Sequence, residues 1–330
     1  MIVPARNEQD VLGMCSQSLV EQQGISFEII VVDDRSTDRT RAIAESFQGV
    51  RVVEAEPLSA GWTGKANAVT CGARLARGAW LLFTDADTVH KPGSLARSLA
   101  EAQERGAALL SYSPEQEVHG FVEKSVMPVI FAELASRYRP SAVSDPGSDA
   151  AAANGQYILI SREAYDAVGG HAAVAGSLLE DVELARLVKR TGRKIFFRFA
   201  PDQVRTRMYR TTTQLIEGWT KNLVLLFPSP VGLACLRMME CLAIWASGLI
   251  GIAFLLRGSL VLGTALLVLC GILKLFLLRR ILRAHFAWDS NLLAIFGLPF
   301  FAYLLLRSVI QYKRGKVAWK GRLYPGSPAA

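Results

Sequence analysis

The chain is poor in cysteine. Its five cysteines, Cys15, Cys71, Cys235, Cys241 and Cys270, are odd in number and form no C-x-x-C pair, which argues against a disulfide framework and against a zinc site. A free cysteine in an apolar segment behaves as a small hydrophobic residue. We therefore expect the polar part of the chain to face a reducing compartment, the cytosol.

Acidic residues are scarce after residue 230. Residues 231–330 contain 12 Lys and Arg but 2 Asp and Glu, although the whole chain has 37 basic and 29 acidic residues. The same third is also the most apolar. Basic residues beside apolar segments are typical of membrane proteins, whereas a nucleic-acid surface needs them on a polar domain. The pattern predicts the membrane bilayer as a partner and argues against nucleic acid.

Strand and helix signals alternate over the first 230 residues. The strands FEIIVVDD (27–34), VRVVEAE (50–56) and AWLLFTDAD (79–87) are separated by helical patterns, which predicts parallel βαβ units. Functional groups in such folds gather at the carboxyl ends of the strands, and two of these strands end in a pair of aspartates, Asp33 with Asp34 and Asp85 with Asp87. Further predicted elements are helices at 66–76 and 92–105 and from residue 180, an amphipathic segment at 116–140, and strands at 156–161 and 195–202.

The first residues, MIVPARNE, begin almost inside a predicted strand, with no room for a signal peptide. We expect the natural chain to extend further upstream, to complete this strand and to add a membrane helix.

Three apolar segments, 231–256, 259–278 and 291–310, are each long enough to cross a hydrocarbon core of about 30 Å at about 1.5 Å per residue. Basic residues follow both the second and the third segment, and a third span would separate them across the membrane. We therefore expect the third segment to be re-entrant, with its bend at Gly297 and Pro299. The prediction is two or three membrane segments followed by a basic tail.

Two carboxylates follow the buried strand WLLF. Asp85 and Asp87 are one residue apart in TDAD. Mg²⁺ and Mn²⁺ take oxygen ligands, commonly one or two carboxylates together with phosphate oxygens of a substrate. The pair fits a cation bound to a diphosphate, and an Asx turn before the helix near residue 92 explains it equally well.

Three further groups have a chemical interpretation beside a structural one. Asp33 and Asp34 suit hydrogen bonds to a base or ribose, since capping of the next helix leaves them unexplained. Lys65, between a glycine loop and a helix start, suits a phosphate, and a solvated lysine is the alternative. Glu180 and Asp181 at a helix start provide a general base or stabilise the helix dipole.

These motifs form an ordered series along the chain: VPARNE (3–8), VVDDRSTD (31–38), GWTGK (61–65), TDAD (84–87), NGQ (154–156), GGH (169–171) and LED (179–181). From Ile2 to Asn222 the chain resembles family 2 of the inverting glycosyltransferases. The GWTGK block and the apolar last third look most like membrane-bound members that act on lipids, such as ceramide, hopanoid-associated and carotenoid glycosyltransferases.

The resemblance implies an α/β fold with a GT-A (Rossmann-like) mixed sheet and helices on both faces. It places this nucleotide-sugar transferase domain in residues 1–228, followed by an α-helical membrane region in residues 229–330. One departure matters: relatives often carry Q-x-x-R-W after the base, whereas QLIEGW (214–219) has no arginine in register. The assignment of the acceptor subsite depends on this motif, and its loss argues against a processive polysaccharide synthase.

The resemblance also implies a role for individual residues. Asp181 would be the general base of a single in-line displacement, and Asp87 would hold a divalent metal, Mg²⁺ or Mn²⁺. Asp85 would contact the ribose or the metal. The nucleotide site would further include Pro4, Glu8, Asp34 and Lys65, and the acceptor or diphosphate would be contacted by Glu180, Trp219 and Arg210.

The predicted function is transfer of one sugar from a nucleotide-sugar donor, a UDP-sugar, to the hydroxyl of a lipid acceptor. The enzyme would be a multi-pass protein of the cell (inner) membrane with its catalytic domain facing the cytoplasm. Transfer to a polyprenyl phosphate and a non-catalytic membrane scaffold of the same fold are the alternatives. A sugar-nucleotide pyrophosphorylase would share the sheet but needs a glycine-rich phosphate loop that VPARNEQD does not provide.

Overall fold

A computed structural model describes residues 1–324, which form two compact units. The first, here called the sheet unit, comprises Met1–Glu117 and Tyr138–Met208. The second, the helical unit, comprises Val118–Arg137 and the chain from Tyr209 onward. The domain boundary after residue 228 stays a prediction. As packed bodies, however, segments 118–137 and 209–228 group with the apolar last third, because the helices they form pack against it.

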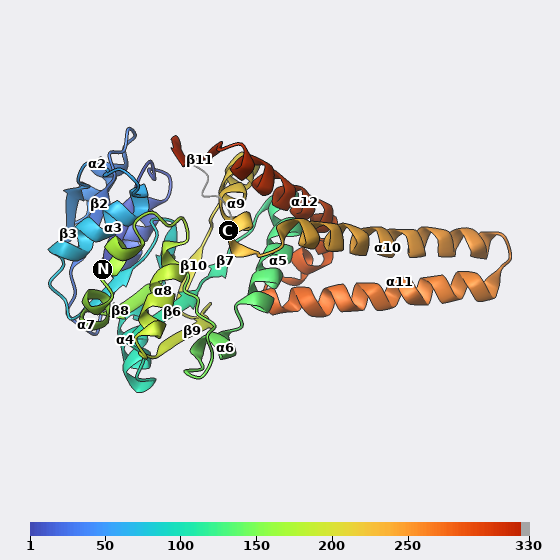
Figure 1. Ribbon diagram of the computed structural model, residues 1–330, viewed down its shortest axis with the longest axis horizontal. Coiled ribbons are helices and arrows are strands. Elements are labelled where there is room, and N and C mark those ends of the chain that lie inside the picture. The colour runs from blue at the N-terminus through green and yellow to red at the C-terminus, as the bar shows by residue number, and fades with distance from the viewer. Residues whose placement is uncertain (325–330) are drawn as a thin grey trace. The chain divides into compact units, whose positions relative to one another are not determined.

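The sheet unit is built on a central sheet that has seven strands within the described residues (Figure 1). Neighbouring strands are parallel except for β8, which lies antiparallel between β4 and β6. This confirms the predicted mixed α/β sheet, with the carboxyl ends of β2, β1 and β4 at one edge. The spatial order is β3 (Val50–Glu54), β2 (Ile29–Asp33), β1 (Ile2–Ala5), β4 (Trp80–Phe83), β8 (Ile158–Ser161), β6 (Leu109–Ser113) and β9 (Ile195–Phe199).

After β4 the chain continues into β5, which belongs to a second, smaller sheet. Its strands, in spatial order, are β5 (Thr88–His90), β10 (Val204–Thr206) and β7 (Glu115–Gln116). The helices of the unit are α1 (Leu12–Val20), α2 (Thr40–Glu45), α3 (Gly64–Leu75), α4 (Ser94–Glu104), α6 (Pro140–Ser144), α7 (Arg162–Ala167), η1 (Gly170–Val174) and α8 (Glu180–Arg190).

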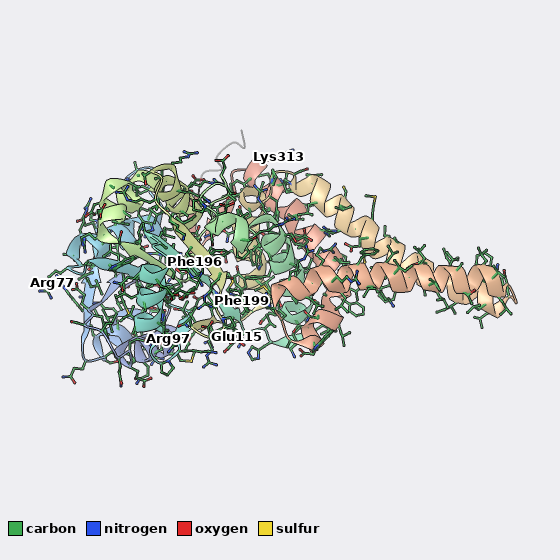
Figure 2. The ribbon with its side chains drawn as sticks, turned by 90° about the horizontal axis from the view of Figure 1, so that it is seen from below. Arg77, Arg97, Glu115, Phe196, Phe199 and Lys313 are labelled. Carbon is green, nitrogen blue, oxygen red and sulfur yellow. The ribbon has the colours of Figure 1, made fainter. Side chains whose placement is uncertain are left out.

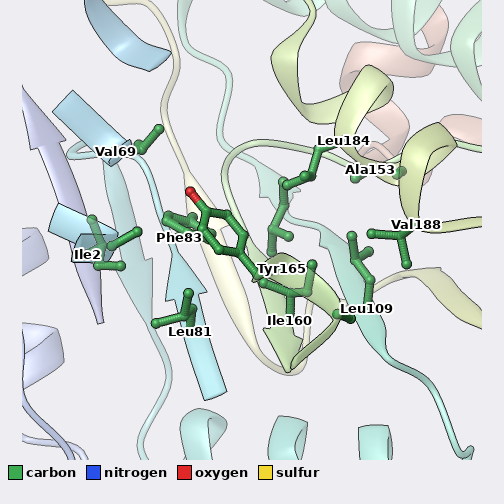
Figure 3. Close-up of a cluster of buried hydrophobic side chains, with 14 of the residues drawn as sticks. Ile2, Val69, Leu81, Phe83, Leu109, Ala153, Ile160, Tyr165, Leu184 and Val188 are labelled. Atoms are coloured by element: carbon green, nitrogen blue, oxygen red, sulfur yellow. The ribbon is translucent and has the colours of Figure 1, made fainter. Parts of the chain in front are cut away.

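Hydrophobic clusters cover both faces of the central sheet, because side chains along a strand point alternately to opposite faces. In β4, Leu81 and Phe83 point into the cluster that α3 and α8 cover, which contains Val69 and Leu184 (Figure 3). Leu82 points to the other face and joins the cluster under α1 and α4. Both clusters are closed to solvent, so the strand ends are held on a rigid base.

The helical unit contains α5 (Gly120–Arg137), α9 (Thr212–Leu226), α10 (Pro230–Leu256), α11 (Leu260–Ile281), η2 (Leu282–Ala284) and α12 (Trp288–Lys313), and ends in β11 (Val317–Trp319) and β12 (Arg322–Tyr324). α10 and α11 form an extended helical hairpin (Figure 1). Among the described residues, three helical segments are long and apolar enough to cross a membrane, with mean hydropathies of 2.0, 2.5 and 2.0.

The expected bend in the third segment is wrong. α12 is one continuous helix of 26 residues that includes both Gly297 and Pro299. The glycine instead allows a close helix crossing: a Cβ at position 297 would lie 2.0 Å from the backbone oxygen of Ser125 on α5. Gly297 therefore sets the distance between α12 and α5.

Candidate active site

The carboxylate turn TDAD stands directly at the end of β4, as predicted. Its backbone is held from below by hydroxyl groups: the Asp85 carbonyl accepts a hydrogen bond from Thr88 Oγ1 at 2.7 Å, and the Asp87 carbonyl accepts one from Thr206 Oγ1 at 3.1 Å. Thr84 Oγ1 in turn donates to the Gln156 carbonyl at 2.8 Å. The turn that carries the two acids is thus fixed through its backbone, and the Oδ1 atom of Asp87 is buried.

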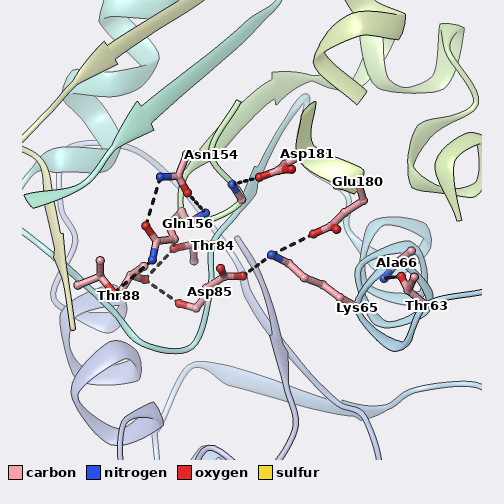
Figure 4. A network of polar contacts seen from close by, with 12 residues as sticks. Thr63, Lys65, Ala66, Thr84, Asp85, Thr88, Asn154, Gln156, Glu180 and Asp181 are labelled. Atoms are coloured by element: carbon pink, nitrogen blue, oxygen red, sulfur yellow. Dashed lines mark hydrogen bonds and ion pairs between the residues drawn. The ribbon is translucent and has the colours of Figure 1, made fainter. Parts of the chain in front are cut away.

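Lys65 lies at the start of α3. The helix is capped by Thr63, whose Oγ1 accepts a hydrogen bond from the Ala66 N–H at 3.2 Å, so the motif GWTGK builds a regular helix N-terminus. From the first turn, Lys65 Nζ reaches Asp85 Oδ1 at 2.8 Å and Glu180 Oε1 at 3.1 Å (Figure 4). One ammonium group therefore joins the end of β4 to the start of α8.

Asp181 is held beside this ion pair by the backbone of the NGQ motif. Gly155 N–H donates to Asp181 Oδ2 at 2.9 Å (Figure 4). A Cβ at position 155 would lie 2.7 Å from Lys65 Nζ, so a side chain there would displace the lysine. Glycine lets the backbone approach both charged groups without displacing Lys65. We call Lys65, Asp85, Glu180 and Asp181 the Lys65 cluster.

Burial and charge shift the pKa values in this cluster. Desolvation by burial, reinforced by the negative charge of Glu180, raises the pKa of Asp181 to about 6, although Lys65 and two backbone N–H groups oppose the shift. Burial alone would lower the pKa of Lys65, but attraction to Asp85, Glu180 and Asp181 outweighs it and holds that pKa well above its usual range. Lys65 is thus a permanent cation, and Asp181 titrates within the physiological range.

The other residues predicted for the nucleotide site also lie in the sheet unit. Pro4 lines the same small cavity as Lys65, Asp85 and Asp181. Asp34 follows β2 and is 5% exposed, and its backbone carbonyl accepts a hydrogen bond from Arg6 at 2.6 Å. Glu8 lies on the loop before α1, where its backbone N–H donates to Thr40 Oγ1 at 2.7 Å.

Trp219 and Arg210 belong to the helical unit. The Trp219 ring is 2% exposed, and its Nε1–H donates to Met127 Sδ at 3.3 Å. It also packs edge-on against Phe131, and these contacts account for its burial without a ligand. Arg210 is exposed before α9, and its backbone N–H donates to Gln214 Oε1 at 2.9 Å. Their assignment to an acceptor or diphosphate site stays a prediction.

Sequence reasoning missed the buried support beneath the acidic turn. His90 Nε2 lies 2.9 Å from Thr84 Oγ1, and Thr84 Oγ1 lies 2.8 Å from Thr88 Oγ1. Burial lowers the pKa of His90 to about 3, so its ring is neutral. His171 is similarly enclosed, with a pKa of about 4 and a 3.1 Å hydrogen bond between its Nδ1 and Tyr165 OH. The sequence signal that could have revealed this support is the pair Thr88 and His90, two polar residues at alternate positions of a strand, both of which are buried.

The carboxylates of the turn suit a cation that binds together with its substrate. No group of three or more His, Cys, Asp or Glu side chains is arranged as a metal site in the part of the chain that the structure describes. A hard divalent cation needs one or two carboxylates when diphosphate oxygens and water complete its shell. The donor set of Asp85 and Asp87 fits that requirement.

The mixed sheet carries an acidic turn at the end of β4, and Lys65 and Asp181 approach it from the starts of α3 and α8; the fold is of the GT-A type. The sequence matches Glycosyl transferase family 2 over residues 1–169, and the chain belongs to this family. It is a glycosyltransferase.

The chain is similar to curated proteins and to a solved structure. The 4,4'-diaponeurosporenoate glycosyltransferases of Staphylococcus aureus strains MRSA252 and USA300 are each 28% identical to the chain, over 98% of it and 87% of their own length. Among solved structures, a mannosyltransferase of Pyrobaculum calidifontis in complex with GDP-Man and Mn²⁺ matches with a TM-score of 0.54 and 17% identity. That match covers 94% of this chain and 85% of the other, and it supports the fold.

Proposed function

We propose that this enzyme is a membrane-associated inverting glycosyltransferase that moves one sugar from a UDP-sugar to a hydroxyl group of a lipid. The proposal places the protein in the cell membrane as a multi-pass protein, with the sheet unit in the cytoplasm. The observation that carries it is the Lys65 cluster, in which a carboxylate of raised pKa stands 2.9 Å from a backbone N–H and beside a lysine that contacts the acidic turn.

The chemistry assigned to this cluster is a single displacement. Asp181 accepts the proton of the acceptor hydroxyl while its oxygen forms a bond to the anomeric carbon. The bond from that carbon to the diphosphate breaks on the opposite face, and the nucleoside diphosphate leaves with the electron pair. Inversion follows because the new bond forms opposite the old one.

Lys65 and the acidic turn serve the leaving group. Lys65 supplies a fixed positive charge near the diphosphate, and the N-terminus of α3 adds backbone N–H groups. Asp87 and Asp85 would hold Mg²⁺ or Mn²⁺, which neutralises diphosphate charge when bound. Pro4, Glu8 and Asp34 would line the nucleotide side of the site. The Mn²⁺ in the Pyrobaculum mannosyltransferase complex is consistent with this assignment.

The staphylococcal relatives favour a lipid-like acceptor, since they are named for a diaponeurosporenoate, a carotenoid acid. That name also supports a second acceptor class, a carboxylate. A carboxylate, like the phosphate of a polyprenyl phosphate, is already an anion at neutral pH and needs no general base. Dependence on Asp181 therefore separates a hydroxyl acceptor from both anionic acceptors.

The test is sugar transfer in membranes from cells that express the full chain. Radiolabelled nucleotide sugars are offered with a lipid alcohol, a carotenoid acid or a polyprenyl phosphate, with and without EDTA. Asp87→Asn is compared with the matched control Asp166→Asn, an exposed carboxylate on α7 of the same unit. We expect a labelled lipid in wild type and control, and its loss with EDTA and in Asp87→Asn. Equal product in all four samples would refute the metal-assisted mechanism.

A further inference from the structure

The helical unit contains a closed ring of buried charges. Arg237 on α10 lies 2.9 Å from Glu133 on α5 and 2.9 Å from Glu240. Arg280 on α11 lies 3.3 Å from Glu133 and 2.7 Å from Glu240. The four side chains are 8% to 17% exposed. We call them the Glu133 ring; its charges sum to zero, and it joins three helices at one level of the unit.

Beyond this ring the hairpin of α10 and α11 is apolar on its outer surface (Figure 2). From the ring to the tip, α10 has about 16 residues and α11 about 20, or about 24–30 Å at 1.5 Å per residue. A bilayer core is about 30 Å thick. Exposed large side chains of this part include Leu249, Leu256, Val261, Val268 and Phe276. The hairpin thus has the length and surface to cross a bilayer and return.

Helix α5 cannot cross a bilayer, although its 18 residues would span most of one. The chain leaves the sheet unit at Glu117, three residues before α5 begins, and re-enters it at Tyr138, directly after α5 ends. That unit carries most of the charged residues of the chain and stays in water. Both ends of α5 therefore lie on the same side of the membrane.

Helix α12 is fastened to helices that start on this side. Its first turn is ion-paired through Asp289 to Lys124 of α5, and Gly297 packs against Ser125. Near its end, Ser308 Oγ donates to the Thr220 carbonyl of α9 at 2.6 Å and accepts from the Val224 N–H at 3.0 Å. α9 begins four residues after the sheet unit ends. α12 cannot leave this side without breaking these contacts.

We propose that the chain crosses the bilayer twice, through α10 and α11, and that α12 lies in the plane of the membrane beside α5 and α9. The partner surface is a phospholipid bilayer with anionic headgroups. An apolar stripe suited to the interface runs along the exposed face of α12: Trp288, Leu292, Phe296, Tyr303, Leu306 and Ile310.

The charge pattern fits this arrangement and removes the conflict over orientation. With α12 in the plane, Arg279, Arg283 and the basic residues after Lys313 all face the same leaflet, where the positive-inside rule places them. Arg257 at the tip reaches the opposite headgroups. Lys274 is six residues, or about 9 Å along the helix, from Arg280, so its long side chain extends toward the near interface.

The test is side-specific labelling of single cysteines in the full-length protein. The background is Cys235→Ser, because the remaining cysteines are buried. Met14→Cys reports the sheet unit, Ser259→Cys the hairpin tip, Ala287→Cys the connection between α11 and α12, and Lys316→Cys the end of α12. A membrane-impermeant maleimide is applied to intact spheroplasts and to inverted vesicles of bacteria expressing each variant.

We expect positions 14, 287 and 316 to be labelled from one side and position 259 from the other. Labelling of position 316 together with 259 would establish a third span and overturn the proposal. Position 259 labelled from the side of position 14, or from neither side, would overturn the spanning hairpin. A phosphatase fused after Ala330 gives an independent readout without cysteine changes: we expect it inactive, and an active fusion again means a third span. Neither readout depends on the proposed reaction.

Discussion

The two units each contain an ionic cluster, and the clusters differ in charge balance. In the Lys65 cluster three carboxylates share one ammonium group, whereas in the Glu133 ring two carboxylates alternate with two guanidinium groups. Excess buried negative charge raises the pKa of a carboxyl group and favours a bound cation. A balanced ring has no excess charge for a bound ion to neutralise. We therefore propose that charge balance distinguishes the proposed catalytic cluster from a contact that holds helices together.

The largest effect on activity should follow from replacing Asp181, the carboxylate whose pKa is raised. Asp181→Asn keeps an acceptor oxygen for the Gly155 N–H but cannot take a proton, so we expect the turnover rate to fall about 10²- to 10⁴-fold. Because burial disfavours the ionised carboxylate, thermal stability at neutral pH should be unchanged or higher. Initial rates and thermal unfolding of the two proteins measure both effects. A variant that keeps most of its rate with a lipid alcohol would show that another group is the base.

Neutralising a carboxylate of the Glu133 ring should have the opposite effect: it should lower the stability of the protein rather than its activity. Glu240→Gln leaves two guanidinium groups on one carboxylate, and breaking a buried pair costs about 3–5 kcal/mol of unfolding free energy. We expect the KM for the donor to stay the same in the protein that remains folded. Denaturant unfolding in detergent provides the measurement.

Its matched control is Asp289→Asn, which breaks an exposed ion pair in the same unit and should cost much less stability, because solvent screens exposed charges. Equal losses in the two variants would mean that the ring is no more important than a surface pair.

A smaller loss should come from the helix crossing at Gly297. Gly297→Ala inserts a methyl group 2.0 Å from the Ser125 carbonyl oxygen, and overpacking of this kind costs about 1–3 kcal/mol. Gly271→Ala on α11 is the control, since a Cβ there meets no atom within 4 Å and alanine favours the helix by up to about 1 kcal/mol. Thermal unfolding in detergent should therefore move in opposite directions. A stabilised Gly297→Ala protein would contradict the close packing of α5 and α12.

We expect kcat/KM to depend on pH through the Lys65 cluster. Asp181 must be ionised to accept a proton, so kcat/KM should fall below pH about 6, roughly tenfold per pH unit. The contribution of the Asp181 carboxyl group to folding stability changes with pH in the opposite direction to the activity. Because the folded pKa exceeds the usual 3.8, the folded state binds the proton more tightly, and this contribution grows as pH falls from about 6 toward 4.

Lys65→Gln tests whether Asp181 is the group that sets the acid limb of the pH–rate profile. It removes the attraction that lowers the pKa of Asp181, so the acid limb of the pH–rate profile should move to higher pH. An unchanged limb would mean that a different group titrates. The equivalent neutral change in the helical unit, Glu240→Gln, should leave the limb where it is.

Much of the site could be predicted because its residues follow local rules. Asp85 and Asp87 stand at the end of a buried run, Lys65 lies at a capped helix start, and Glu180 and Asp181 begin α8 as expected. Each position depends on a few neighbouring residues. The antiparallel insertion of β8 and the strand β6 could not be read in this way, because their partners are far away in the sequence.

The third apolar segment shows the limit of composition. Its glycine and proline suggested a bend, but a glycine is also what a close crossing of two helices requires, and the sequence of α12 does not contain its partner α5. Arg237 and Glu240 similarly place two charges inside the first apolar segment. Their partners Glu133 and Arg280 are 104 and 43 positions from Arg237, so the closed ring was invisible in the segment itself.

The sequence by itself determined the family, the chemical groups at the strand ends and the lengths of the apolar helices, because these depend on residue type and short spacing. Only the tertiary structure decided which charges share a partner. Lys65 meets Asp85 and Glu180, and Glu133 meets Arg237 and Arg280, through contacts between elements far apart in the chain. Electrostatic energy depends on distance and burial, which exist only once the elements pack.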